Sequence, residues 1–286
     1  MKSVIKVLSL GTIFGICVAL GVLFTLKGLE TEDVKDVDRL EKVIRPTVTI
    51  QYQGLGGGSG TCIFKEEVNG KIEAYFLTAN HVVDFSMYRR YSTGCSPYNP
   101  VYPNCNEYGT PVEEEVLPPP LFLKGWLPKD GELIEVFSYT ATIYKAWPEI
   151  DTAIVKIVED PESLITQLPC AKLESAEVFD GLKPGHPVVC SGCPYLLPCV
   201  ISKGHIGRHD FIGGNMPPGF PNHFCLVRVN IAGGASGGGI YNYDNMKVIG
   251  IVSIGWGNEA FICGMIPISD ILPKLKSTYL GQRIGL

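Results

Sequence analysis

Apolar residues along this chain occur mainly in short runs that glycine, proline and polar residues interrupt. Residues 75–79 form one such run, and Ala153, Val155 and Ile157 alternate with their neighbours as side chains do in a half-buried strand. This pattern predicts a mostly β chain built from many short strands. Near the C-terminus, residues 269–272 predict a short closing helix with Ser269 as its N-cap.

A longer apolar run occupies the N-terminus. Residues 7–26 carry no charge and lie between Lys6 and Lys27, and about 20 apolar residues suffice for a helix to cross a bilayer. We therefore expect an uncleaved transmembrane helix within residues 1–27, followed by a charged stalk at residues 28–45. The alternative is a cleaved signal peptide, although the run exceeds the usual apolar core of such peptides and residues 17–19 form a poor cleavage site.

Composition narrows the class of protein. The chain has 286 residues, of which 45% are apolar, and its 33 glycines and 21 prolines fit one large core with many turns. Its net charge is −5 and it has no basic run, so we expect no nucleic-acid partner. Residues 86–130 include Pro118–Pro120 and three consecutive glutamates, which do not suit a central strand. We expect an insertion there, either a cover for a cleft or a passive surface loop.

Three short segments carry candidate chemistry. Residues 78–83 contain His81, residues 151–155 begin with Asp151, and residues 234–238 contain Ser236. A serine hydroxyl attacks a carbonyl only when a base removes its proton, and a carboxylate holds the imidazole base in one tautomer. Each segment alone fits a turn or a structural histidine, but together they predict a His81, Asp151 and Ser236 triad. Gly234 can aim its N–H, together with that of Ser236, at a developing oxyanion.

The order His, Asp, Ser resembles the chymotrypsin-like (trypsin-like) serine proteases and differs from the subtilisin-like and α/β-hydrolase orders. Residues 57–64 and 76–83 are similar to the Gly-Ser-Gly strand and the Leu-Thr-Asn-His-Val-Val segment of the HtrA/Deg branch. Residues 188–194, 248–253 and 261–268 extend the resemblance to most of the chain. Only residues 268–286 follow, which is too short for the PDZ domain of many HtrA proteins.

The resemblance implies a fold of two six-stranded antiparallel β-barrels with the active site between them. We place the first barrel at residues 46–158, with the insertion near 86–130, and the second barrel with the closing helix at residues 159–286. Ala235 departs from the family pattern, because it cannot form the buried salt bridge that an aspartate makes there in activated trypsins. We therefore expect no activation by propeptide cleavage.

The function implied is a membrane-anchored serine endopeptidase that cleaves protein or peptide substrates, unfolded ones included, through an acyl-enzyme. No cofactor and no catalytic metal are expected. Asn230 and Ile231 fall at the base of the primary specificity pocket, and the uncharged pair favours small or medium apolar P1 side chains. Ser253, Ile254 and Gly255 are expected to pair with the substrate backbone as an added strand. Two alternatives remain: a catalytically inactive binding scaffold and a non-proteolytic serine hydrolase.

The ten cysteines include Cys17 in the expected anchor, which leaves nine in the following domain. Cys95 and Cys105 flank a short loop and suggest a local disulfide, although spacing alone does not fix connectivity. An alternative for another group is a zinc site with ligands from Cys190, Cys193, Cys199 and either His205 or His209. The remaining strand-like positions suggest buried free thiols at Cys62, Cys225 and Cys263.

Two sequence features give opposite predictions for the side of the membrane on which the domain lies. Lys and Arg residues are more numerous after the apolar run than before it, which favours a cytoplasmic domain. The number of cysteines and the resemblance to tethered HtrA-like proteases favour the opposite side. Because large domains translocate largely regardless of charge, we expect a single-pass membrane protein with an extracytoplasmic catalytic domain.

Overall fold

The computed structural model describes residues 38–85, 118–129, 132–213, 220–255 and 261–286. The chain divides into two units, residues 1–41 and 42–286, and all named strands lie in the second unit. The expected anchor at residues 7–26 and the suggested Cys95–Cys105 disulfide fall outside the described residues. No helix within the described ranges is long and apolar enough to cross a membrane.

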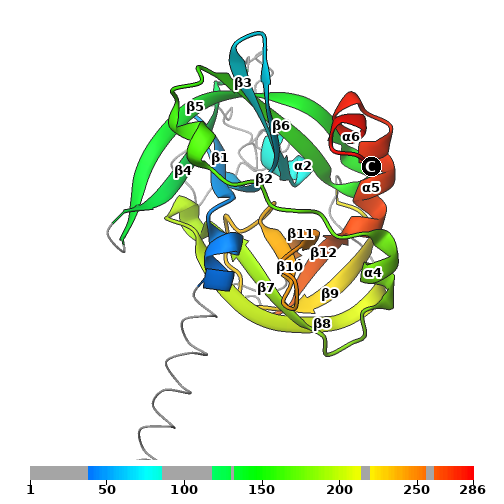
Figure 1. Ribbon diagram of the computed structural model, residues 1–286. Helices are drawn as coiled ribbons and strands as arrows, with labels where there is room; N and C mark the ends of the chain where they lie inside the picture. The colour runs from blue at the N-terminus through cyan, green and yellow to red at the C-terminus, as the bar shows by residue number, and fades with distance from the viewer. Residues whose placement is uncertain (1–37, 86–117, 130–131, 214–219, 256–260) are drawn as a thin grey trace, which may run out of the picture. The chain divides into compact units, whose positions relative to one another are not determined.

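Six antiparallel strands close the first barrel in the order β1-β2-β3-β6-β5-β4 (Figure 1). The strands are β1 (Thr47–Tyr52), β2 (Gly57–Val68), β3 (Lys71–Thr78), β4 (Leu121–Lys129), β5 (Glu132–Trp147) and β6 (Thr152–Glu159). A short helix, α2 (Asn80–Val83), follows β3, and a 3-10 turn, η1 (Pro148–Ile150), precedes β6. The segment that leads out of this barrel contains η2 (Leu164–Gln167) and α4 (Ala176–Gly181).

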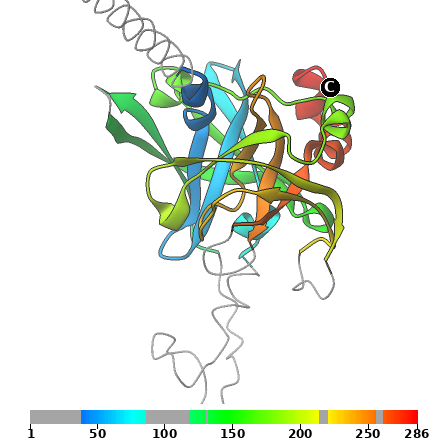
Figure 2. The same cartoon turned by 90° about the horizontal axis from the view of Figure 1, so that it is seen from below.

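The second barrel closes in the order β10-β11-β12-β9-β8-β7. Its strands are β7 (Pro187–Gly192), β8 (Val200–Ile212), β9 (His223–Arg228), β10 (Gly239–Asn242), β11 (Val248–Gly255) and β12 (Cys263–Pro267). The turn η3 (Pro194–Leu196) joins β7 to β8. Two closing helices follow, α5 (Ile268–Lys276) and α6 (Tyr279–Arg283), and α5 packs beside α4 (Figure 2).

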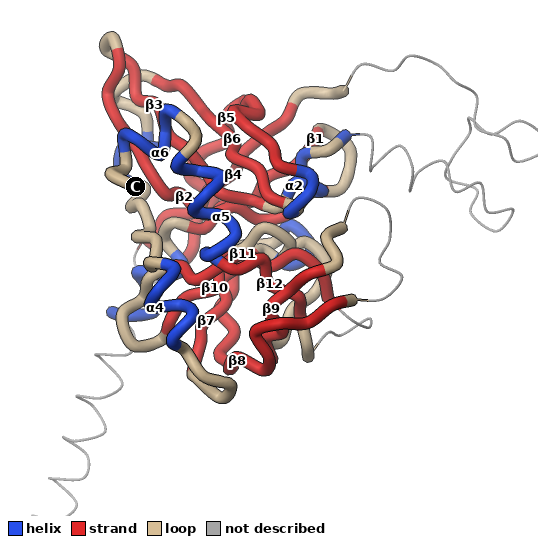
Figure 3. Tube along the Cα trace, turned by 90° about the vertical axis from the view of Figure 1, so that its right-hand side faces the viewer, coloured by secondary structure: helices blue, strands red, loops and turns tan. Residues whose placement is uncertain are grey.

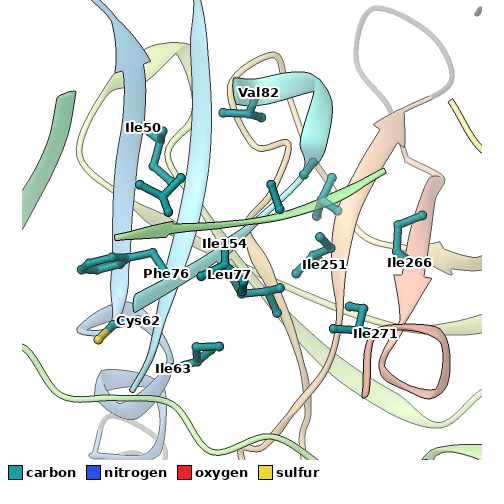
Figure 4. Close-up of a cluster of buried hydrophobic side chains, with 14 of the residues drawn as sticks. Ile50, Cys62, Ile63, Phe76, Leu77, Val82, Ile154, Ile251, Ile266 and Ile271 are labelled. Carbon is teal, nitrogen blue, oxygen red and sulfur yellow. The ribbon is translucent and has the colours of Figure 1, made fainter. Parts of the chain in front are cut away.

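One hydrophobic cluster includes side chains from both barrels. Figure 4 shows Leu77 and Ile154 of the first barrel, Ile251 and Ile266 of the second, and Ile271 of α5 within it. The apolar side of α5 is buried because the isoleucine and leucine positions recur at helical spacing. This shared core holds the two barrels together as one body.

The sequence prediction of two six-stranded antiparallel barrels is confirmed, with two local corrections. The expected insertion near 86–130 extends too far, because β4 occupies Leu121–Lys129 and pairs with β1 and β5. The prolines that precede β4 make its strand pattern hard to recognise in the sequence. Residues 86–117 lie outside the described ranges. The closing helix begins at Ile268, so Pro267 rather than Ser269 is the N-cap, and no side chain caps this end.

Candidate active site

His81 lies in α2, at the boundary between the two barrels (Figure 3). Strand β3 ends at Thr78, and the chain turns at once into α2, whose first N–H, that of Asn80, donates to the Asp151 carbonyl at 3.1 Å. The Val82 and Val83 side chains are buried beneath this turn. The end of β3 therefore fixes where the imidazole of His81 lies.

Asp151 is fully buried, and its carboxylate contacts both the backbone and the ring of His81. It adopts a left-handed conformation (φ 46°, ψ 46°) after η1, which aspartate tolerates better than most residues. Its carboxylate accepts the backbone N–H of His81 at 2.9 Å, and its Oδ2 lies 2.9 Å from His81 Nδ1. Because a carboxylate only accepts, the proton of this pair sits on Nδ1, and Nε2 is left as the basic nitrogen.

Ser253 connects this pair to Ser236. The Ser253 hydroxyl donates to Asp151 Oδ2 at 2.5 Å, and its carbonyl oxygen accepts from Ser236 Oγ at 3.4 Å. No described hydrogen bond joins Ser236 Oγ to His81. The structure thus connects all three predicted residues through Ser253, with the serine hydroxyl turned toward Ser253 rather than toward the imidazole.

The backbone around Ser236 leaves two N–H groups open. Gly234 has a φ of +94°, and a Cβ there would lie 2.8 Å from the Cys193 carbonyl oxygen and the Tyr195 nitrogen. Among the described residues, neither the Gly234 N–H nor the Ser236 N–H donates a hydrogen bond. Two such donors, separated by one residue, suit a developing oxyanion.

A cavity of about 280 Å³ is lined in part by Ala235, the residue before Ser236. The predicted pocket residues Asn230 and Ile231 both line it, and the other lining residues are Cys190, Gly192, Pro194, Val200, Ser202, Ala232, Ala235 and Phe261. None of these side chains is charged. Burial raises the pKa of the Cys190 thiol to about 12, so this sulfur also stays neutral at physiological pH.

The predicted backbone-binding residues Ser253, Ile254 and Gly255 form the end of β11. On one side this end pairs with β12, where Gly255 lies opposite Cys263. On the other side β10 pairs with β11 only as far as Ile251. Within the described residues, the remaining edge is therefore available to an extended peptide.

The cysteines near the pocket are arranged differently from the zinc alternative. Cys193 and Cys199 form a disulfide that closes the turn containing η3. The zinc alternative is wrong for this cluster, because two of its four ligands are joined to each other. No group of metal-ligating side chains occurs elsewhere in the described ranges. Free thiols at Cys62, Cys225 and Cys263 are buried, as predicted.

Two residues beside the site escaped the sequence analysis. The Phe220 ring packs against the His81 imidazole with ring centroids 4.9 Å apart. Ser59 in β2 lies under the Ser236 segment, and its N–H donates to the Ser236 carbonyl at 2.7 Å. Phe220 lies in an irregular segment without periodicity. Ser59 belongs to a recognised Gly-Ser-Gly motif, but only the packing of the barrels reveals its contacts.

Comparison with protein families identifies one match. Residues 58–251 match the family described as the trypsin-like peptidase domain. This range contains His81, Asp151 and Ser236, together with most of both barrels. Comparison with curated proteins gave no match.

Solved structures with this fold include HtrA-type proteases. The crystal structure of Deg5 aligns with a TM-score of 0.54 at 18% identity, covering 85% of this chain and 92% of Deg5. The Rv3671c protease of M. tuberculosis H37Rv, in an inactive form, aligns with a TM-score of 0.51 at 16% identity, covering 87% of this chain and 93% of Rv3671c. The HtrA-type protease AlgW with a decapeptide aligns with a TM-score of 0.54 at 16% identity, covering 87% of this chain and 66% of AlgW. At these identities the likeness establishes the fold alone.

Proposed function

Because the chain belongs to the trypsin-like peptidase domain family, we propose that it is a serine endopeptidase that uses Ser236 as nucleophile. The observation that carries this proposal is the buried Asp151 carboxylate 2.9 Å from His81 Nδ1, with Ser253 linking the same carboxylate to Ser236. These contacts leave His81 Nε2 as the basic nitrogen.

In the proposed reaction, Ser236 Oγ attacks the peptide carbonyl while His81 Nε2 takes its proton. Asp151 holds the imidazole in the required tautomer and stabilises its cationic form. The Gly234 and Ser236 N–H groups donate to the oxyanion of the tetrahedral intermediate. His81 then returns the proton to the leaving amine, and water hydrolyses the acyl-enzyme by the same route. A rotation about the Cα–Cβ bond of Ser236 is required, since its hydroxyl faces the Ser253 carbonyl.

The proposed substrates are proteins or peptides with a small or medium apolar P1 residue. Support comes from the uncharged cavity of about 280 Å³ lined in part by Ala235, where a charged P1 group would lose its hydration without gaining a partner. The open edge of Ser253, Ile254 and Gly255 offers main-chain groups to an extended substrate. Val, Ala and Leu are the expected P1 residues.

We also propose that residues 7–26 anchor the protein in a membrane and that the protease domain is extracytoplasmic. The uncharged run supports the anchor. The Cys193–Cys199 disulfide supports an oxidising compartment, because cytosolic thiols are usually kept reduced.

The decisive experiment compares the purified protein with its Ser236→Ala variant. The wild type should react with a fluorophosphonate at Ser236 and hydrolyse unfolded casein, whereas the variant should keep its fold and lose about a millionfold in kcat. Circular dichroism and thermal unfolding serve as the control for folding. Unlabelled wild type would favour the binding scaffold, and a labelled protein without activity on casein or a peptide library would favour a non-proteolytic hydrolase.

A further inference from the structure

Ser59 is a buried serine of the first barrel whose polar groups are all engaged around Ser236. Its hydroxyl donates to the Gly234 carbonyl oxygen at 2.7 Å and accepts the Cys193 N–H at 2.8 Å. Its backbone N–H donates to the Ser236 carbonyl at 2.7 Å, and its own carbonyl accepts from Thr78 Oγ1. Three of these four bonds cross from the first barrel into the second. The side chain is fully buried, so water does not replace them.

The two peptide groups that flank Gly234 are each held by a hydrogen bond to a residue outside the loop that contains Gly234. The Gly233 carbonyl oxygen accepts the Tyr195 N–H at 2.6 Å. Because C=O and N–H point in opposite directions in a trans peptide, this bond turns the Gly234 N–H away from Tyr195. The next peptide is held at its carbonyl, that of Gly234, by the Ser59 hydroxyl.

These two restraints matter because Gly234 is a glycine with a φ of +94°. Glycine rotates between alternative backbone conformations at little cost, so an unrestrained peptide here could turn its carbonyl toward the site in place of its N–H. Ser59 restrains one peptide directly. Ser59 restrains the Gly233–Gly234 peptide indirectly. Its hydroxyl accepts the N–H of Cys193, and Cys193 is the first residue of the disulfide-closed turn that contains Tyr195.

We propose that Ser59 is a positioning residue for the oxyanion hole, a role that rests on the proposed peptidase function. Its hydroxyl extends from the first barrel to the second and holds the Gly234 carbonyl and the Cys193 N–H. The Gly234 N–H thereby keeps the orientation that stabilises the tetrahedral intermediate. Ser59 touches no substrate in this role. Since the oxyanion forms only during reaction, the restraint acts on kcat and leaves substrate binding nearly unchanged.

The test compares Ser59→Ala with Ser191→Ala. Ser191 is the matched control, since it is also fully buried and its hydroxyl lies 2.8 Å from that of Thr47 across the same barrel interface, with no described hydrogen bond to Gly234. Ser59→Ala should lower kcat about 10- to 100-fold at an almost unchanged KM. Its affinity for a peptide boronic acid, which forms a tetrahedral adduct with the nucleophile, should fall by the same factor. Ser191→Ala should keep both values.

A second variant keeps the test decisive should Ser59→Ala fail to fold. Ser59→Cys fills the same space with a weaker hydrogen-bonding group, so an intermediate loss of kcat and of boronate affinity is expected. Either folded variant with wild-type kcat and boronate affinity would overturn the positioning role while leaving the proposed function intact. A wild type that neither cleaves peptides nor binds the boronic acid would instead overturn the proposed function, and the role of Ser59 with it.

Discussion

Ser253 shows how one residue can serve two parts of the site. Its hydroxyl donates to the buried Asp151 carboxylate, while its carbonyl lies within reach of Ser236 Oγ. A hydrogen bond to a charged group contributes about 1.5–3 kcal/mol, more than a neutral one. The hydroxyl therefore helps hold the Asp151 carboxylate in its position against His81.

Ser253→Ala should consequently lower kcat about 10-fold or more, because the carboxylate loses one of its described donors and can shift relative to His81. Steady-state kinetics on a peptide substrate measure the loss. Ser277→Ala, which removes an exposed hydroxyl whose described hydrogen bond goes to the Lys274 carbonyl, is the control and should leave kcat unchanged. Equal activity of the two variants would contradict the role given to Ser253.

Asn230 offers a way to test the assignment of the pocket. It lines the cavity from its solvent-exposed side, where a carboxylate would keep part of its hydration. Asn230→Asp should raise kcat/KM for Lys and Arg at P1 about 10-fold relative to wild type, and added salt should reduce the gain. A peptide-library profile measures both effects, and Asn230→Ala controls for loss of the amide. An Asp variant without any new preference for basic P1 residues would place P1 elsewhere.

At the scale of elements, strands were easier to predict from the sequence than their contacts. The apolar run before His81 and the alternation after Asp151 predicted β3 and β6, and the motif order predicted which loops meet. The sequence did not predict strand β4, because prolines precede it and Pro128 lies inside it. The contacts of Ser59 and Phe220 depend on packing between segments far apart in sequence, which leaves no local pattern.

Glu174 joins the segment between the barrels to the turn before β11. Its buried carboxylate accepts bonds from Asn245 Nδ2 at 2.5 Å, Lys247 Nζ at 3.2 Å and the Ser175 N–H at 3.2 Å. Burial alone would raise the pKa of this carboxyl, but these bonds outweigh it and hold the pKa below the ordinary value. The charged form therefore stabilises the fold above the unfolded-state pKa, and this contribution disappears as pH falls through the folded-state pKa.

Glu174→Gln should lower the free energy of unfolding by about 1–3 kcal/mol at neutral pH, with a smaller difference from wild type below about pH 4. Urea unfolding at several pH values measures this. Asp160→Asn is the control, because its ion pair with Lys71 is exposed and should contribute little at any pH. A Glu174→Gln loss that does not shrink in acid would point to altered packing rather than to charge.

For the whole molecule, the shared core explains how residues of the two barrels keep fixed positions in the candidate site. Side chains of both barrels and of α5 belong to one buried cluster, so neither barrel completes its core alone. His81 and Asp151 come from one barrel and Ser236 from the other. Their mutual geometry therefore depends on the interface that Ser59 also crosses.

The proposed membrane anchor and the proposed extracytoplasmic position of the protease domain can be tested together. With residues 7–26 as a retained anchor and the protease domain outside the cytoplasm, the full chain should resist carbonate extraction from membranes. Protease added to intact cells should digest its domain. Alkylation in denaturant before reduction should leave Cys193 and Cys199 unmodified, while the free thiols Cys62, Cys190 and Cys225 react. A variant lacking residues 1–27 is the control for anchoring. Protection of the domain in intact cells, together with alkylation of Cys193 and Cys199, would show a cytoplasmic orientation and give priority to the excess of Lys and Arg after the apolar run.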